Sequence, residues 1–188
     1  VTGVQTCALP ICDFIVEKRM RDQTNQLVMH LKLAKAEAIR TGERVSICAA
    51  NTSSCVVTPC PTKQTGPSSG HNPLCKDTEC TCAAGNWELG WLGWIDLDGN
   101  GTYDPTVNMD EDDYEPVVLF ESPLTGGNTL RSPSGDFPTT ISFAPNGASL
   151  NGSGEFVLCD SRGLGSGRVI GVRATGRVRA VATNAGGV

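Results

Sequence analysis

Oxygen-bearing side chains recur through one short acidic segment of this 188-residue chain. Positions 1, 3, 5 and 9 of a calcium-binding loop are matched by Asp96, Asp98, Asn100 and Asp104. Gly101 stands at position 6, where such a loop turns sharply, but the bidentate glutamate of position 12 is replaced by Val107. The spacing therefore predicts calcium as a possible cofactor, bound without the strongest of its usual ligands.

The acidic loop extends over residues 96–116, and its charge bears on this prediction. Nine acidic residues and no basic residue lie between Asp96 and Glu121, so their carboxylates repel one another unless a cation or an arginine neutralises them. The alternative is a solvated turn, because Asp, Asn and Gly favour turn conformations without any ion. The sequence leaves both interpretations open.

Positive charge is concentrated near the C-terminus. From Asp160 onward there are five arginines and one acid, a local charge of +4 in a chain whose net charge is −5. On a strand, Arg177 and Arg179 project from the same face about 6.6 Å apart, a spacing comparable to successive phosphates of a DNA strand. With Arg173, they are the candidate contacts to double-stranded DNA. Alternatively, they keep a sheet edge soluble or pair with the acidic loop of a neighbour.

Cysteine content indicates an oxidising, exported compartment. Beyond residue 12 the chain has seven cysteines, which are Cys48, Cys55, Cys60, Cys75, Cys80, Cys82 and Cys159. Cys48 and Cys55 flank a short polar loop and form the preferred disulfide pair, and the four other cysteines of the insertion can make two more bridges. Zinc is disfavoured because no C-x₂-C pair is present. Cys159 lies in an apolar segment and is expected to be a free thiol.

No catalytic constellation emerges from the remaining reactive side chains. His30 lies in a helical segment and His71 in the cysteine-rich stretch, without a triad or a metal motif around either. Ser161 and the glycines near it do not form a nucleophile elbow. We therefore expect a protein that is not an enzyme.

One long helix precedes the segments that hold these side chains. Residues 13–40 contain neither Gly nor Pro, and an apolar stripe repeats at helical spacing through Leu27, Leu31, Ala34 and Ala38. Gly42 is expected to end the helix in a left-handed cap. At 1.5 Å per residue the helix is about 40 Å long, and only its C-terminal half has an apolar stripe to pack on a core.

After Gly42 the period changes to two, which predicts short strands. Their segments are residues 45–48, 117–120, 140–143, 155–158 and 168–173, and turn signals such as Asn151-Gly152 separate the later ones. One helix followed by hairpins predicts an α+β fold, a long N-terminal amphipathic helix packed on antiparallel sheet of short strands. The polar, cysteine-rich residues 55–85 are expected to form a surface loop insertion.

The ordered set of features resembles the GspH/FimT family of type IV pilus minor pilins and type II secretion pseudopilins. The features are residues 33–40 (LAKAEAIR), the strand ending at Cys48, Gly90-Trp91, Gly93-Trp94-Ile95-Asp96, Asp98-Gly99-Asn100-Gly101, Thr129-Leu130-Arg131, Ile141-Ser142-Phe143 with Gly147, Phe156-Val157-Leu158-Cys159 and Gly176-Arg177-Val178-Arg179. The resemblance runs from about Leu27 to Arg179. It implies a type IV pilin-like fold whose residues 13–42 are the C-terminal part of the pilin helix and whose residues 43–188 are a β-rich head.

The resemblance also implies a function and a place in the cell. Members of this family are made as prepilins, processed and methylated, held in the inner membrane by the helix, and assembled with other pilins or pseudopilins in the bacterial cell envelope. The motif at Gly176 to Arg179 looks like the one through which competence-type members bind DNA. Three functions therefore stay open: a structural minor pilin, a DNA-uptake pilin and a secretion pseudopilin.

The first twelve residues depart from the family. Residues 1–11 (VTGVQTCALPI) resemble a translated sequencing adapter, so we exclude residues 1–12, Cys7 and Cys12 included, from fold reasoning. The family carries a basic leader and an apolar helix half at this place. We accordingly expect the native N-terminus, with these two features, to be missing from the sequence.

Overall fold

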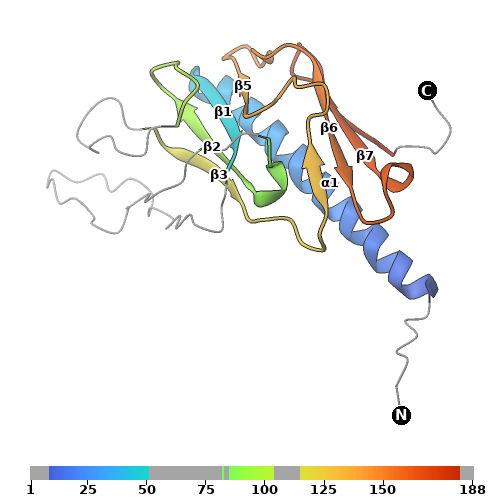
Figure 1. Ribbon diagram of the computed structural model, residues 1–188. Helices are drawn as coiled ribbons and strands as arrows, with labels where there is room; N and C mark the ends of the chain where they lie inside the picture. The colour runs from blue at the N-terminus through green and yellow to red at the C-terminus, as the bar shows by residue number, and fades with distance from the viewer. Residues whose placement is uncertain (1–8, 51–81, 83–84, 104–114, 183–188) are drawn as a thin grey trace, which may run out of the picture.

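The computed structural model describes residues 9–50, 82, 85–103 and 115–182. One long helix leads into eight strands and two short 3₁₀ helices (Figure 1). In chain order the elements are α1 (Leu9–Thr41), β1 (Arg44–Ala49), η1 (Trp87–Leu89), β2 (Trp91–Asp96), β3 (Val117–Glu121), β4 (Thr129–Arg131), β5 (Thr140–Phe143), β6 (Gly154–Cys159), η2 (Leu164–Ser166), β7 (Arg168–Val172) and β8 (Val178–Ala182). This is the expected α+β fold, with the helix on antiparallel sheets of short strands.

Helix α1 packs through the predicted stripe, since Leu27, Leu31, Ala34 and Ala38 are at most 1% exposed. The buried face begins earlier than expected, because Met20 is also fully buried. The helix ends as predicted, with Gly42 at φ 75° and its N–H donating to the Ala38 carbonyl at 3.1 Å. The core therefore covers more than the C-terminal half of the helix.

The N-terminal turns of α1 extend past the edge of the sheets (Figure 1). The helix starts at Leu9, four residues before the start expected from the sequence and inside the segment 1–12 that resembles an adapter. Within the described residues, no helix combines the length and the apolar character needed to cross a bilayer.

The first sheet has the strand order β3-β2-β1-β5, and all its pairings are antiparallel. Val45, Ile47 and Ala49 of β1 face the helix and the main core. The alternate residues face the other way, yet Ser46 and Cys48 are also fully buried, because a second apolar cluster around Trp94 and Tyr103 covers that face. We name this side the outer face of the first sheet.

The second sheet has the order β4-β6-β7-β8 and lies beside the first against the same helix (Figure 1). Phe156, Ile170 and Val172 turn inward and join the main core, which is shared with α1 and the first sheet. Of the alternate residues, Glu155 and Arg179 are exposed, whereas Val157 and Val169 are half-buried. The second sheet is thus covered on one side only.

The five strands predicted from the sequence are present as β1, β3, β5, β6 and β7. The strand considered for Arg177 and Arg179 is present as β8, which begins at Val178, directly after Arg177. No strands were predicted for the residues of β2 and β4. Strand β2 is apolar on both faces, so its sequence WLGWID has no alternation to detect. Strand β4 has only three residues, too few to show a period. The insertion expected over 55–85 lies almost entirely outside the described residues.

Candidate functional site

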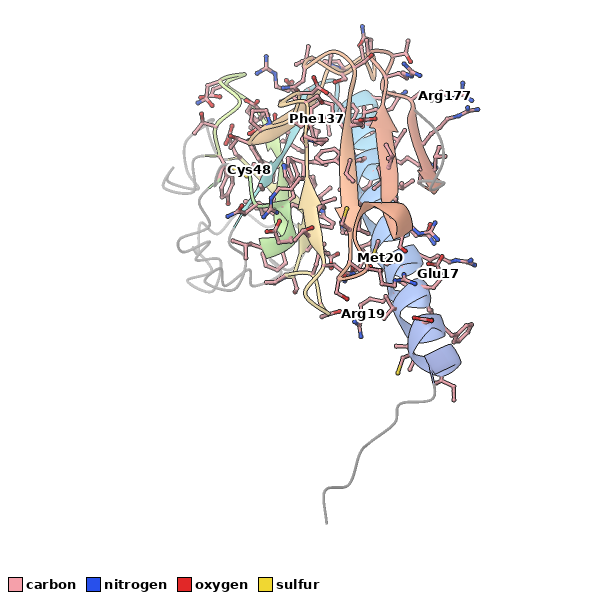
Figure 2. The ribbon with its side chains drawn as sticks, turned by 45° about the vertical axis from the view of Figure 1, so that its right-hand side comes forward. Glu17, Arg19, Met20, Cys48, Phe137 and Arg177 are labelled. Carbon is pink, nitrogen blue, oxygen red and sulfur yellow. A yellow bond between two sulfur atoms is a disulfide. The ribbon has the colours of Figure 1, made fainter. Side chains whose placement is uncertain are left out.

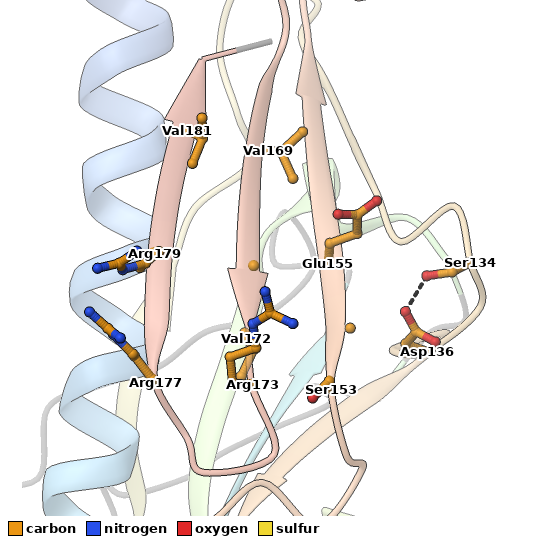
Figure 3. Close-up of a pocket in the computed structure, with 12 residues that line it drawn as sticks. Ser134, Asp136, Ser153, Glu155, Val169, Val172, Arg173, Arg177, Arg179 and Val181 are labelled. Atoms are coloured by element: carbon orange, nitrogen blue, oxygen red, sulfur yellow. Dashed lines mark hydrogen bonds between the residues drawn. The ribbon is translucent and has the colours of Figure 1, made fainter. Parts of the chain in front are cut away.

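The three arginines singled out in the sequence lie together on the second sheet (Figure 3). They line a shallow groove with a volume of about 520 Å³ on the exposed face of β6, β7 and β8. We name it the arginine groove, and its lining residues are Ser134, Asp136, Ser153, Gly154, Glu155, Val169, Gly171, Val172, Arg173, Arg177, Arg179 and Val181. Figure 2 shows Arg177 on the far side of the head from Cys48.

Strand register explains why the groove is open. Gly171 of β7 pairs with Glu155 on one side and with Arg179 on the other. A Cβ built at Gly171 would meet no atom within 4 Å, so the middle of this row is empty. Because Gly171 has no side chain, there is open space between Glu155 of β6 and Arg179 of β8.

The β7–β8 turn fixes the direction of the arginines. Its backbone N–H at Arg173 donates to the Arg177 carbonyl at 2.9 Å, and the Lys35 ammonium of α1 donates to the Thr175 carbonyl at 3.1 Å. Gly176 has φ 70°, and a Cβ there would lie 1.9 Å from the Gly147 carbonyl oxygen. Only glycine fits this close approach, which places Arg177 at the groove's edge.

The charge of the groove is less positive than the sequence suggested. Asp136 and Glu155 also line it, so three cations face two carboxylates and the formal sum is 3 − 2 = +1. Asp136 accepts a hydrogen bond from the Ser134 hydroxyl. In the described part of the chain, no salt bridge joins Arg173, Arg177 or Arg179 to a carboxylate. Their guanidinium groups are available for an anionic partner.

A second candidate site lies at the end of the first sheet. Asp96, Asp98 and Glu115 each place a carboxylate oxygen within 4.8 Å of the other two, and we name these three residues the carboxylate cluster. Asp96 and Glu115 are buried, and Asp98 is exposed. Sequence reasoning predicted Asp96 and Asp98 as ligands but missed Glu115, which lies 19 positions after Asp96 and reaches it only through strand pairing.

The other two predicted calcium ligands are placed differently. The Asn100 amide nitrogen donates to Asp98 Oδ2 at 2.5 Å, and its oxygen accepts from the Thr102 N–H at 2.5 Å. Asn100 thus serves the turn itself. Asp104 lies outside the described residues, as does Val107.

The predicted disulfide is wrong in its partner. Cys48 is bridged, but to Cys82, with 5.6 Å between the two Cα atoms, and not to Cys55. The chain returns after the insertion and forms an antiparallel bridge between Ala50 and Cys82, which brings Cys82 beside β1. Proximity in sequence favoured Cys55, whereas the long-range strand contact decides the pair. Cys159 is a free, half-buried thiol, and burial raises its pKa.

Ion pairs join α1 to the second sheet at its N-terminal half. The Glu17 carboxylate accepts a hydrogen bond from Arg168 of β7 and lies 3.6 Å from Arg162. Burial raises the pKa of Glu17, but hydrogen bonds from Arg168 and Arg21 outweigh this and hold the pKa below its ordinary value. The sequence showed this part of the helix as polar without indicating that it contacts the head.

Beyond these contacts the helix presents apolar side chains to solvent. Phe14 is 69% exposed and Ile15 is 50% exposed, both within the first two turns of α1. Large apolar side chains gathered on an exposed surface mark a site of protein or membrane contact.

Comparison with known proteins identifies the family to which this chain belongs. The family model described as type II transport protein GspH matches residues 23–187. Two crystal structures of the type IV minor pilin FimU from Pseudomonas aeruginosa strain PAO1 share the fold, with TM-scores of 0.55 and 0.51. They are 14% and 15% identical, over 90% and 87% of this chain and 93% of each FimU chain. No curated protein sequence matches the chain.

Proposed function

The chain belongs to the GspH family, and from that premise we propose that it is a structural minor pilin of a type IV pilus, where it takes part in fibre assembly. Its partners are other major and minor pilins, and its helix connects the head to the inner membrane before assembly. The alternative within the same family is a type II secretion pseudopilin. The genes beside its own distinguish the two, since pilus and secretion clusters encode different sets of proteins.

The observation that carries this proposal is the projecting end of α1. The head holds the helix through the buried stripe from Met20 to Ala38, while Phe14 and Ile15 stay exposed beyond it. Burying each of these side chains against a neighbouring helix contributes about 1.5–3 kcal/mol. A surface of this kind suits a subunit whose helix packs among the helices of a fibre.

A two-hybrid assay against the pilin-like proteins encoded beside the gene tests the proposal. A double Phe14→Glu, Ile15→Glu variant is expected to weaken the interaction signal by at least about tenfold, since two apolar contacts are lost. Leu150→Glu is the matched control, because Leu150 is an apolar head residue that is 51% exposed. An unchanged signal in the helix variant, or an equal loss in the control, contradicts the proposal.

A second candidate function, DNA binding, rests on the arginine groove. Arg173, Arg177 and Arg179 line one groove without a salt-bridge partner among the described residues. Phosphate contacts of this type carry no sequence information, so the expected binding is non-specific. Glu155 and Asp136 reduce the local charge to +1, which limits the affinity.

Fluorescence anisotropy with a short DNA duplex at several salt concentrations tests this function. The double Arg177→Ala, Arg179→Ala variant is expected to lower the salt slope by about two units, since each phosphate contact contributes about 0.9. Lys18→Ala, Lys32→Ala removes the same charge from exposed positions of α1 and should leave the slope unchanged. Glu155→Gln should strengthen binding. Absence of binding at low salt, or an unchanged slope in the arginine variant, refutes DNA binding.

A further inference from the structure

We propose that the carboxylate cluster Asp96, Asp98 and Glu115 binds one calcium ion at the end of the first sheet. The sequence pattern suggested a local loop that extends to Asp104. The folded chain offers a different set of ligands, one from the end of β2, one from the turn that follows it and one from the approach to β3.

Strand pairing builds the cluster. Antiparallel pairing places the end of β2 beside the start of β3, and the Ile95 N–H donates to the Pro116 carbonyl at 3.0 Å. Glu115 is therefore held next to Asp96 by the ladder itself. Arg44, the first residue of β1, pairs with Asp96 from the other side. Three strands of the first sheet thus determine where the carboxylates meet.

The hydrogen bonds of Asp96 leave one of its oxygens available. Its Oδ2 accepts from the Ser46 hydroxyl at 3.1 Å, the Gly101 N–H at 3.0 Å and the Arg44 guanidinium at 3.4 Å. The Asp96 side chain is 0% exposed, and its Oδ1 has no hydrogen-bond partner among the described residues. A buried carboxylate oxygen without a partner is costly, and a cation bound at this oxygen removes the cost.

Charge balance points in the same direction. The cluster gathers three carboxylates within 4.8 Å, two of them buried, and Arg44 supplies one positive charge at Asp96 Oδ2. Like charges at this distance repel one another, and burial strengthens the repulsion. A divalent cation on the Oδ1 side would reduce the repulsion among the three carboxylates.

The turn around Asp98 is already arranged for binding. Asp98 Oδ1 accepts from the Asn100 N–H at 2.9 Å, which orients the carboxylate from within the turn. Each carboxylate oxygen has a second lone pair, so Asp98 can hold this bond and a metal at once.

The ligand chemistry favours calcium over other common cations. All three side chains offer hard oxygen donors, which zinc uses less than nitrogen or sulfur. Magnesium requires a near-octahedral arrangement, whereas calcium accepts irregular sets completed by backbone oxygens and water. With three carboxylates and no dedicated twelve-residue loop, the dissociation constant is expected at about 10⁻⁴–10⁻³ M, the range of extracellular calcium modules.

Thermal unfolding of the full chain, treated with EDTA and then given calcium, tests the site. About 10 mM CaCl₂ should raise Tm by about 3–10 °C, as linkage predicts for this affinity and chain length. The same concentration of MgCl₂ should raise it by less than half as much. Calorimetric titration should give one calcium per chain. No rise with calcium, or an equal rise with magnesium, overturns the proposal.

Two variants separate calcium binding from a purely structural role. Asp98→Asn and Glu115→Gln keep side-chain size but remove one charge each, so Tm in EDTA should stay constant or rise while the calcium-induced rise falls by more than half. Glu155→Gln, which removes a carboxylate from the arginine groove, should keep the full rise. Calcium responses that are unchanged in both cluster variants overturn the proposal, even if one of them lowers Tm in EDTA.

Discussion

The two sheets of this protein share one helix and one core, yet their outer faces differ. The outer face of the first sheet is covered by the apolar cluster around Trp94 and tied by the Cys48–Cys82 disulfide. The outer face of the second sheet is bare and carries the arginine groove. Both sheets are four-stranded and antiparallel, so the difference comes from the side chains that cover their outer faces.

The contrast suggests different roles for the two faces: the covered face contributes to stability, and the bare face is available for binding. On the covered face the Ser46 hydroxyl is paired with Asp96 and Ser142, and the unpaired Oδ1 of Asp96 is aimed at a candidate ion site, because an unpaired buried group is costly. Charged side chains on the bare face have water around them, and their substitution should change binding more than folding. The four predictions below run from the largest expected effect on stability to the smallest; three test the contrast, and the one on His30 tests the core that both sheets share.

Removing the disulfide should produce the largest effect. Cys48 and Cys82 are 34 positions apart, and closing a loop of that length stabilises a fold by about 4 kcal/mol in the chain-entropy estimate. A double Cys48→Ser, Cys82→Ser variant should lose about 2–4 kcal/mol of unfolding free energy, measured by urea denaturation. Cys159→Ser is the control, because that thiol is free. Equal stability of the double variant and the wild type would show that the covered face does not depend on the bridge.

The sequence predicted the features that depend on residues close together in the chain, and it missed those that depend on residues far apart. The helix stripe, its Gly42 cap and five strands follow local periods, and they were predicted correctly. The Cys82 partner and Glu115 depend on which strands pair, and pairing joins residues far apart in the chain. Local alternation puts Ser46 on the strand face opposite Val45 and Ile47, but it cannot show that an apolar cluster covers that face.

The buried serine gives the next prediction. Ser46 donates to Asp96, so its 2.7 Å contact with the Ser142 hydroxyl is made with Ser142 as donor. Ser46→Ala should cost about 1–3 kcal/mol, because buried groups then lose their partner. Ser161→Ala, at an exposed turn of the second sheet, should change stability by less than about 0.5 kcal/mol. The urea midpoints of the two variants are compared. Equal midpoints would show that a polar side chain on the covered face contributes no more to stability than an exposed one on the second sheet.

A pH-dependent prediction concerns the contact between α1 and the first sheet. His30 Nδ1 accepts the Trp91 indole N–H at 2.9 Å, so the buried imidazole is neutral in the folded chain. Burial lowers the pKa of His30 below 6.5, although the Glu121 carboxylate opposes the shift. Folding therefore favours the neutral form. Stability should be complete above about pH 6.5 and should fall as the pH drops toward the lowered pKa.

The measurement compares urea midpoints at pH 7.5 and pH 5.5 for the wild type and His30→Gln. The glutamine oxygen can still accept the Trp91 N–H, but it does not titrate. The variant should lose less stability than the wild type between the two pH values. Parallel losses would assign the pH dependence to other groups, His71 among them.

The smallest effect is expected from adding one methyl group to the bare face. Gly171 and Gly93 both lie within inner strands of their sheets, and neither has a positive φ. A Cβ at Gly171 would meet nothing within 4 Å, whereas a Cβ at Gly93 would lie 2.6 Å from Cγ of Leu119. Gly171→Ala should therefore stabilise the fold by about 0.4–1 kcal/mol, since alanine restricts the unfolded chain. Gly93→Ala should instead cost about 1–3 kcal/mol through overpacking. Gly93 faces the shared core, where Leu119 lies, whereas Gly171 faces outward. Thermal unfolding of the two variants decides the matter, because shifts of the same sign would mean that the outer face of the second sheet is packed as tightly as the core.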